Sequence, residues 1–202
     1  MKENRPITTY IILIANVAVF LWLSMTGSTN DTAFMATHGA MLTQDVVGGK
    51  WYELFTSMFL HFGIDHLASN MIVLIAVGLP LENLLGSGRY AVIYLVSGLA
   101  GNVLSAAAEL KTGDFAVSAG ASGAVLGLMG AVIYCLIRHR GRVGGLSLRR
   151  VFLAVFLTLY MGFTNSGVNN AAHIGGLICG FVLAVLFYHP KENRSHYDLQ
   201  TG

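Results

Sequence analysis

Charged residues are scarce in this chain of 202 residues, in which Asp, Glu, Lys and Arg together account for only 11%. A soluble domain usually carries about 25% charged residues, whereas the hydrophobic residue types here reach 54%. The polar side chains are too few to cover the surface of a globule in water. The composition therefore excludes an ordinary soluble domain and predicts an integral membrane protein in contact with the lipid bilayer.

Net charge and cysteine content are also low, and both restrict the function. A net charge of +2, with no basic stripe interleaved with aromatic residues, argues against a nucleic-acid partner. The two cysteines, Cys135 and Cys179, lie within apolar runs, form no CxxC pair and belong to no metal-ligand spacing. We therefore expect free, buried, structural thiols, and we predict neither a metal site nor a cofactor.

Glycine and long apolar runs, in contrast, are abundant. The 24 glycines suit helices that pack backbone to backbone in lipid. Most of the six apolar stretches approach the roughly 20 residues that a membrane-spanning helix needs. They lie at 7–24, 54–79, 89–108, 116–137, 148–164 and 171–188. We predict an all-α membrane protein, a bundle of six transmembrane helices that forms a single domain over residues 1–202.

The basic residues predict how this bundle is oriented. Of the 12 Lys and Arg residues, ten flank one set of helix ends, and only Lys50 and Lys111 flank the other. The positive-inside rule then places both termini in the cytoplasm, residues 25–53 in an outer loop and the basic stretch 138–150 in a cytoplasmic loop. The first apolar stretch is long and lacks a small-x-small cleavage site, so we expect a retained helix rather than a signal peptide. The small size favours a bacterial inner membrane.

With this topology, the second, fourth and sixth helices all run inward from the outer side. Polar residues near their beginnings then share one shallow depth in the membrane, and ionisable residues at such positions are costly and indicate function. We call the polar residues at this depth the polar layer. They are His61, His66 and Asn70 on the second helix, Ser122 on the fourth, and Asn169, Asn170 and His173 on the sixth.

Ser122 and His173 could together form a nucleophilic unit. Ser122 lies near a helix N-terminus, where free N–H groups and the helix dipole favour a developing oxyanion. Small-residue stripes beside both side chains, with Gly123 on one helix and Gly176 and Gly180 on the other, would let the helices approach closely. A serine with a histidine base is the minimum catalytic pair. Taken singly, Ser122 could be a packing residue and His173 a hydrogen-bonded core histidine.

The remaining polar residues predict a dyad and an oxyanion hole. Glu109 and Asp114 are expected in the outer loop before the fourth helix and Glu82 at the inner end of the second, so no carboxylate is placed to complete a triad. His66 and Asn70 are spaced i, i+4 and project from one helix face. Both can donate hydrogen bonds to the oxyanion that an attacking serine creates.

Three segments, in this order, carry a resemblance to a known family. They are "HFGIDHLASN" from His61 to Asn70, "GASG" around Ser122, and "AHIGGLICG" from Ala172 to Gly180. Over residues 51–180 the chain resembles the rhomboid family of intramembrane serine proteases. The resemblance implies that Ser122 is the nucleophile, that His173 is its general base, and that His66 and Asn70 help to form the oxyanion hole. It also identifies Gly120, Gly176 and Gly180 as family glycines and Glu82 as a structural glutamate.

Two positions depart from the family pattern. Trp51-Tyr52 stands where many members have Trp-Arg, so the placement of the first outer loop in the membrane is not carried over. Leu126 stands where an aromatic side chain often packs against the histidine, so the ring of His173 is expected to be held more loosely.

The expected function is that of an endopeptidase that cleaves single-pass membrane proteins in or beside their transmembrane segments, with small residues at the cut and helix-weakening residues nearby. The alternative is a catalytically inactive rhomboid-like protein that binds transmembrane helices, which loss of the serine or histidine would mark. A small transporter or channel is a third interpretation, but it calls for a carboxylate or arginine in mid-membrane. The oligomeric state is left open.

Overall fold

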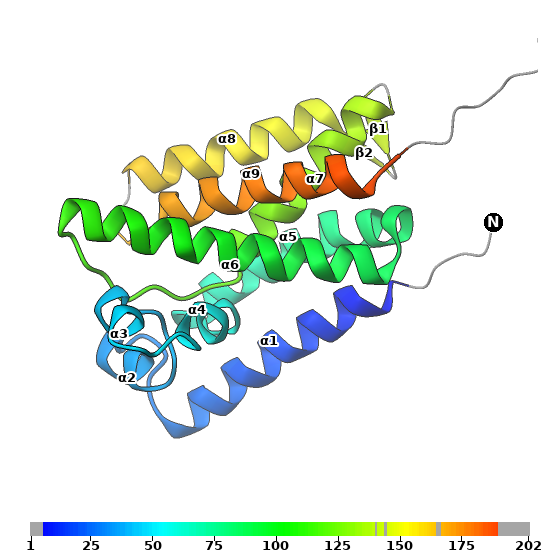
Figure 1. Cartoon of the computed structure of the whole chain (residues 1–202). Helices are drawn as coiled ribbons and strands as arrows, with labels where there is room; N and C mark the ends of the chain where they lie inside the picture. Colours follow the sequence, from blue (N-terminus) through cyan, green and yellow to red (C-terminus); the bar gives the residue numbers. More distant parts are fainter. Residues whose placement is uncertain (1–5, 140, 144, 165–166, 190–202) are drawn as a thin grey trace, which may run out of the picture.

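The computed structural model describes residues 6–139, 141–143, 145–164 and 167–189, and these residues form a helical bundle (Figure 1). The long helices are α1 (Ile7–Thr26), α5 (Gly63–Leu85), α6 (Ser87–Thr112), α7 (Ser122–Arg138), α8 (Leu148–Thr164) and α9 (Asn170–Phe187). Between α1 and α5 lie the short helices α2 (Thr32–Thr37), α3 (Thr43–Val47) and α4 (Glu53–Thr56), followed by the 3-10 turn η1 (Ser57–Phe59). In Figure 1 the beginning of α1 and the end of α9 lie at the same end of the bundle.

Helix α7 forms the centre of the bundle. All of its residues from Gly123 to Ile133 are buried, and it packs against α5, α6, α8 and α9. A helix that is apolar and buried on every side belongs in the interior of a protein, not at its surface. Ser122, at the first position of α7, is thereby held at one end of the core.

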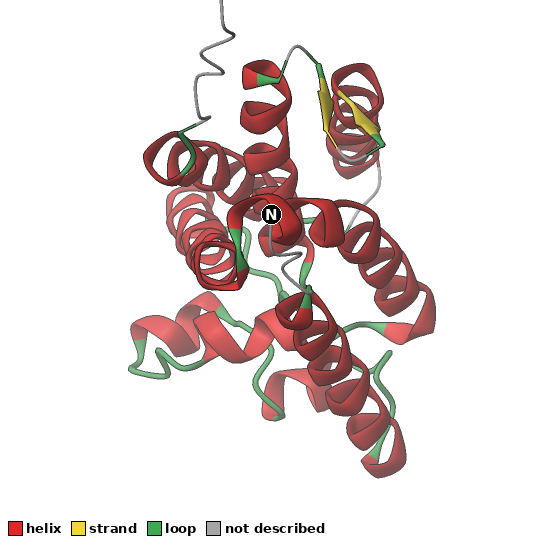
Figure 2. Cartoon of the chain, turned by 90° about the vertical axis from the view of Figure 1, so that its right-hand side faces the viewer, coloured by secondary structure: helices red, strands yellow, loops and turns green. Residues whose placement is uncertain are grey.

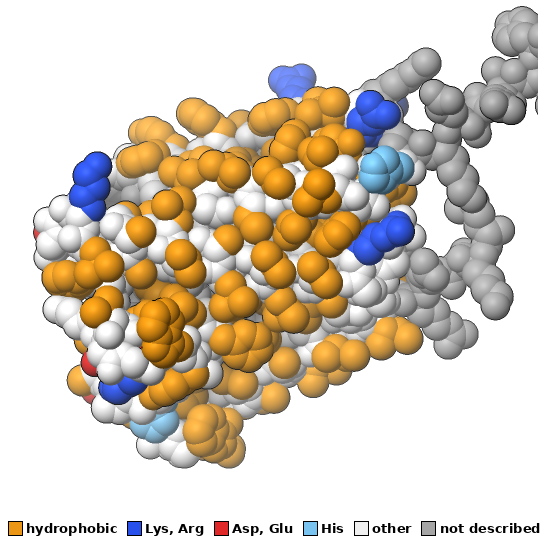
Figure 3. Space-filling model, in the orientation of Figure 1, with side chains coloured by type: hydrophobic (Ala, Val, Ile, Leu, Met, Phe, Trp, Pro, Cys, Tyr) orange, Lys and Arg blue, Asp and Glu red, His pale blue; other side chains and the backbone are white. Residues whose placement is uncertain are grey.

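The surface is that of a membrane protein. Four helices, α1, α5, α6 and α9, are long and apolar enough to cross a bilayer, and α7 is a shorter apolar helix. Hydrophobic side chains cover much of the face in Figure 3, where Lys and Arg side chains lie toward its two ends and along its upper edge. The prediction of a helical membrane protein is confirmed. The six-span count and the orientation stay predictions, and five of the ten basic residues behind them lie outside the described residues: Lys2, Arg5, Arg140, Lys191 and Arg194.

Several predicted boundaries were wrong. The second helix begins at Gly63, not 54, because residues 53–62 form α4, η1 and an extended connection, and His61 therefore precedes α5. The third helix continues to Thr112, so Glu109 belongs to α6 and not to the outer loop. Residues 116–121 are irregular, and α7 starts only at Ser122. The strands β1 (Arg142–Val143) and β2 (Leu146–Ser147) form a small antiparallel hairpin at the rim of the bundle, which the sequence did not predict (Figure 2).

The two cysteines are both free, as expected, and Cys135 is buried. Cys179 is only half-buried, which differs from the prediction of a buried thiol. The buried face of α9 includes Gly176 and Gly180. Cys179 lies beside this face rather than on it, so its side chain points partly away from the core.

The segment between α1 and α5 is held by two buried carboxylates, Glu53 within the segment and Glu109 on α6. Glu53 is almost completely buried and accepts a hydrogen bond from the N–H of Leu42. Glu109 on α6 accepts one from the hydroxyl of Thr43, at 2.6 Å. An unpaired buried carboxylate would be strongly unfavourable, so these hydrogen bonds specify where α3 and α4 lie on α6.

At the opposite end of the bundle, Glu82 joins three helices. Its carboxylate is fully buried and accepts hydrogen bonds from the N–H groups of Thr8 and Thr9, from the hydroxyl of Thr9 and from the hydroxyl of Ser87, all at 2.6–2.8 Å. Two of these donors are first-turn N–H groups of α1, which lack partners within their own helix. The carboxylate therefore caps α1 while it ties α1 to α5 and α6.

We expect Glu82→Gln to lower the melting temperature of the protein in detergent substantially. An amide can turn only one oxygen toward these donors, and a buried donor without a partner costs about 1–3 kcal/mol. Glu109→Gln is the matched control, because its amide oxygen can still accept the single hydrogen bond from Thr43. Equal losses in the two variants would contradict the capping role of Glu82.

Candidate active site

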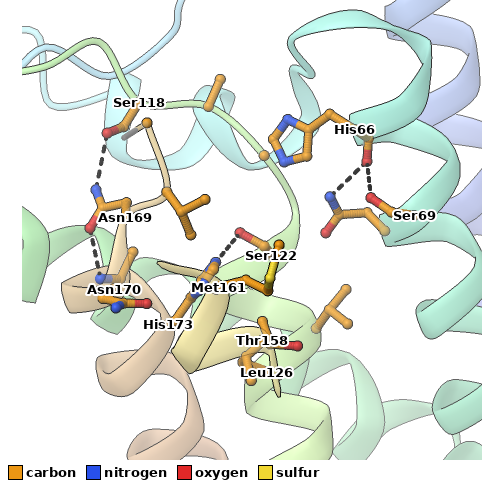
Figure 4. A pocket seen from close by; sticks show the side chains of 18 of the residues that line it. His66, Ser69, Ser118, Ser122, Leu126, Thr158, Met161, Asn169, Asn170 and His173 are labelled. Carbon is orange, nitrogen blue, oxygen red and sulfur yellow. Dashed lines mark hydrogen bonds between the residues drawn. The ribbon is translucent and has the colours of Figure 1, made fainter. Parts of the chain in front are cut away.

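Ser122 and His173 lie within hydrogen-bond distance of each other. The Nε2 atom of His173 is 2.8 Å from Oγ of Ser122 (Figure 4). Ser122 is the first residue of α7, and His173 is in the first turn of α9, so each side chain projects from the beginning of its helix. His173 is 5% exposed. The structure therefore brings together a hydroxyl and an imidazole whose separation permits direct proton transfer.

The close approach of α7 and α9 depends on glycine. A methyl group on Gly176 would overlap the backbone carbonyl of Gly123, and one on Gly180 would overlap that of Gly127. The predicted glycine stripes thus face each other in the structure, and the two backbones are in direct contact. This contact fixes the distance between the beginnings of the two helices, where Ser122 and His173 lie.

Gly180→Ala is expected to push α9 away from α7. The added methyl meets a backbone carbonyl, which cannot rotate aside as a side chain can, and overpacking of this kind costs about 1–3 kcal/mol. Thermal unfolding in detergent should show the loss. Gly88→Ala on α6 is the matched control, because the same methyl there meets no atom within 4 Å. An unchanged melting temperature for Gly180→Ala would refute the contact.

The segment before Ser122 is held in an irregular conformation. Met41 and Ser118 exchange two backbone hydrogen bonds of 2.8 Å, and the N–H of Gly120 donates to the carbonyl of Ser57. The N–H of Ala121 donates to Nε2 of His61, at 3.3 Å. His61, placed by the sequence in the polar layer, therefore supports the chain before the serine. This bond occupies the N–H of Ala121, whereas the N–H of Ser122, at the start of α7, has no hydrogen-bond partner among the described residues.

His66 packs against this segment at Gly120. Gly120 has φ +139°, and a Cβ there would lie 2.7 Å from Cε1 of His66. Glycine is thus required by the backbone conformation and by the ring beside it. Figure 4 shows His66 and His173 on different sides of Ser122.

Asn70 lies one turn after His66 on α5, and both residues line a cavity beside Ser122. Its Nδ2 donates a hydrogen bond of 2.9 Å to the backbone carbonyl of His66. An asparagine amide has two N–H hydrogens, so one remains for another acceptor. The side chain is 6% exposed, and the hydrogen bond fixes its orientation.

Asn169 caps the helix that carries His173. Its Oδ1 accepts from the N–H of Ala172, and its Nδ2 donates to the hydroxyls of Ser105 and Ser118. The side chain thus joins α9 to α6 and to the segment before Ser122 (Figure 4). Sequence reasoning placed Asn169 in the polar layer but did not identify the cap, although an asparagine directly before an apolar helix is a signal for one.

A cavity of about 970 Å³ opens beside Ser122 and His173. Residues of α5, α7, α8 and α9 and of the segment 116–120 line it, and Ala154, Leu157, Thr158 and Met161 come from α8. Leu126 stands at the position where the family pattern often has an aromatic residue. It is 3% exposed and lies in the wall of the cavity below Ser122 (Figure 4). The sequence did not predict the contribution of α8 to this cavity.

The imidazole of His173 is held without a carboxylate. Its Nδ1 is buried, and no described residue makes a hydrogen bond to it. In the neutral ring Nδ1 carries the hydrogen when Nε2 is the acceptor, so the arrangement suits a base that works through Nε2 alone. His173 is 5% exposed, so the residues packed around the ring limit its movement. Among the described residues, no group of three or more His, Cys, Asp or Glu side chains could hold a metal ion.

Comparison with known proteins identifies this architecture. A protein-family model described as "Rhomboid domain" matches residues 48–190. The chain is 33% identical over 190 residues to "Rhomboid protease GluP" of Bacillus subtilis (strain 168), an alignment that covers 94% of this chain and 36% of that protein. It is 30% identical over 189 residues to "Putative rhomboid protease YdcA" of the same organism, covering 94% and 92%. "Rhomboid protease AarA" of Providencia stuartii is 29% identical over 205 residues, covering 89% and 72%. The chain thus spans about a third of the length of GluP and nearly all of YdcA.

Proposed function

Because the chain belongs to the rhomboid family, we propose that it is an intramembrane serine endopeptidase that works through Ser122 and His173. It is a multi-pass integral membrane protein with bacterial homologues. The 2.8 Å separation of His173 Nε2 and Ser122 Oγ, beside a large cavity, carries the proposal. We further propose a single domain of six spans over residues 1–202, with both termini in the cytoplasm of a bacterial cell.

In the first half of the reaction, Ser122 Oγ attacks the scissile carbonyl carbon while its proton passes to Nε2 of His173. The carbonyl oxygen becomes an oxyanion, stabilised by the N–H of Ser122 and by His66 and Asn70. The C–N bond then breaks as Nε2 returns the proton to the leaving nitrogen, which leaves an ester on Ser122. A water molecule then loses a proton to Nε2 of His173 and attacks the ester. As the ester bond breaks, Nε2 returns that proton to Oγ, which releases the acid and restores the hydroxyl of Ser122.

The substrates are proposed to be single-pass membrane proteins. On one side the cavity beside Ser122 is lined by Leu157 and Met161 of α8, which are also exposed on the apolar surface of the bundle, so a segment already in the membrane can reach it. A helical backbone has its carbonyls hydrogen-bonded within the helix, so the segment must unwind locally before attack. This favours helix-weakening residues near the cut and small residues at it.

The test is to incubate purified protein with a panel of tagged single-pass membrane proteins, beside Ser122→Ala. We expect fragments cut in or near the transmembrane segment with the unmodified protein and none with the variant. Capture of these proteins without cleavage by either form would instead support the inactive helix-binding alternative. Fragments that form equally with Ser122→Ala would reject Ser122 as the nucleophile.

A further inference from the structure

One carboxylate lies in the wall of the cavity beside Ser122. It belongs to Glu109, in the last turn of α6, and among the described residues that line the cavity no other is an Asp, Glu, Lys or Arg. The other titratable side chains of this lining are the imidazoles of His66 and His173. A negative charge in a mostly apolar cavity is screened less than one in water, so it acts strongly on whatever enters.

Glu109 has fewer partners than a buried carboxylate needs. The side chain is 9% exposed, and its Oε2 accepts the hydrogen bond from Thr43. No other described residue donates to this carboxylate, and no described Lys, Arg or His forms an ion pair with it. Glu82, in contrast, accepts four hydrogen bonds. A buried carboxylate is costly unless it is well paired, so Oε1 of Glu109 is open to a donor that the described residues do not supply.

The contact between α6 and α3 does not explain why residue 109 is an acid. Thr43 donates one hydrogen bond, and the amide oxygen of a glutamine would accept it equally well. The negative charge therefore points to a second partner, and the cavity is where such a partner can reach the side chain.

The structure also indicates how far Glu109 lies from the bond that is cut. On α6, Gly101 packs against the backbone carbonyl of Ala172, the residue before His173. Glu109 lies eight residues further along the same helix, which is about 12 Å at 1.5 Å per residue. An extended chain covers that distance in about four residues, and a long side chain reduces the number. A lysine or arginine that reaches Glu109 is thus about two to four positions from the cut.

We propose that Glu109 is a specificity-determining residue that selects substrates with a lysine or arginine a few positions from the cut. The proposal rests on the proposed function, because it names the substrate class of the same site. An ammonium or guanidinium group donates to Oε1, and a charge-assisted hydrogen bond of this kind changes an equilibrium by about ten- to a hundredfold. Since Glu109 is at the end of α6, the bound cation lies near the end of the bundle and avoids mid-membrane, where a charge is most costly.

The test compares transmembrane peptides that differ in one residue. Lys, Gln or Glu is placed in turn at successive positions along a tagged peptide of leucine, alanine and glycine, and kcat/KM is measured for each. At one position Lys should be favoured over Gln by about ten- to a hundredfold, and Glu should be disfavoured. Glu109→Gln, which keeps the bond to Thr43, should abolish the preference for Lys at an unchanged melting temperature. Thr43→Val, which loses that bond but keeps the charge, is the matched control and should retain the preference.

Binding to Ser122→Ala separates selectivity from cleavage. The Kd values of the same peptides for this variant, measured by fluorescence anisotropy in detergent, should show the same preference for Lys, and the double variant with Glu109→Gln should not. A preference in binding without cleavage of any peptide by the unmodified protein would leave the selectivity standing and refute the proposed protease. Peptides with Lys and Gln that are cleaved and bound equally, or a preference that persists in Glu109→Gln, would overturn the role of Glu109 and leave the protease standing.

Discussion

His173→Ala is expected to lower the rate of cleavage about 10⁶-fold, and Ser122→Ala to lower it by the same factor, on the precedent of serine proteases in which either member of the pair is removed. The hydroxyl of Ser122 is a poor nucleophile until a base takes its proton, and Nε2 of His173, 2.8 Å from Oγ, is the base that we propose. Single-turnover cleavage of a transmembrane substrate by purified variants measures the effect.

The two residues should act as one unit. The double variant is expected to be no slower than either single variant, because neither residue contributes to this step without the other. A serine-directed phosphonate should modify Ser122 in the unmodified protein and should fail to modify it in His173→Ala. Labelling of Ser122 that persists without His173 would reject the dyad. Labelling at Ser118, which instead accepts a hydrogen bond from Asn169, would mean that the wrong serine was chosen.

Apolar runs predicted which segments are helical better than where the helices begin. The run 148–164 coincides with α8, whereas the run from 54 predicted a start nine residues before Gly63, the first residue of α5. Hydropathy reports which residues avoid water, and an extended connection buried in the protein avoids it as well as a helix does. At Leu60 and Phe62 the backbone is extended, and Gly63 has φ +73°, which no apolar pattern reveals.

The proximity of Ser122 and His173 was easier to foresee than the contacts that hold the two residues. A histidine in an apolar helix is costly enough in a membrane to be noticed, and the serine lies between glycines near the start of another apolar run. The supporting contacts use common residues and backbone groups: His61 with the N–H of Ala121, Asn169 with two serines, and Asn170 with the carbonyl of Leu159. Which carbonyl or N–H lies beside a given amide depends on how the helices pack, and the sequence does not show this.

Removal of His66 or Asn70 is expected to lower kcat by about 10²–10³-fold each, the cost of losing one donor from an oxyanion hole. His66 lies against Gly120 beside Ser122, and the second amide hydrogen of Asn70 is available to the cavity that both residues line. The interaction forms when the oxyanion does, so binding of the substrate should change much less than its cleavage. Because the N–H of Ser122 remains, neither His66→Ala nor Asn70→Ala should be as slow as Ser122→Ala.

The structure offers a matched control for Asn70, because its amide also makes a structural hydrogen bond. Ser69 and Asn70 both donate to the backbone carbonyl of His66, each at 2.9 Å. If Asn70 served only that carbonyl, Ser69→Ala and Asn70→Ala should have similar effects, and activity should fall only in proportion to the folded fraction. If Asn70 also donates to the oxyanion, Asn70→Ala should lose kcat at nearly unchanged melting temperature while Ser69→Ala stays close to the unmodified protein. Melting temperature and single-turnover cleavage, measured on the same preparations, distinguish the two. A lower melting temperature with normal cleavage per folded molecule would remove Asn70 from the oxyanion hole.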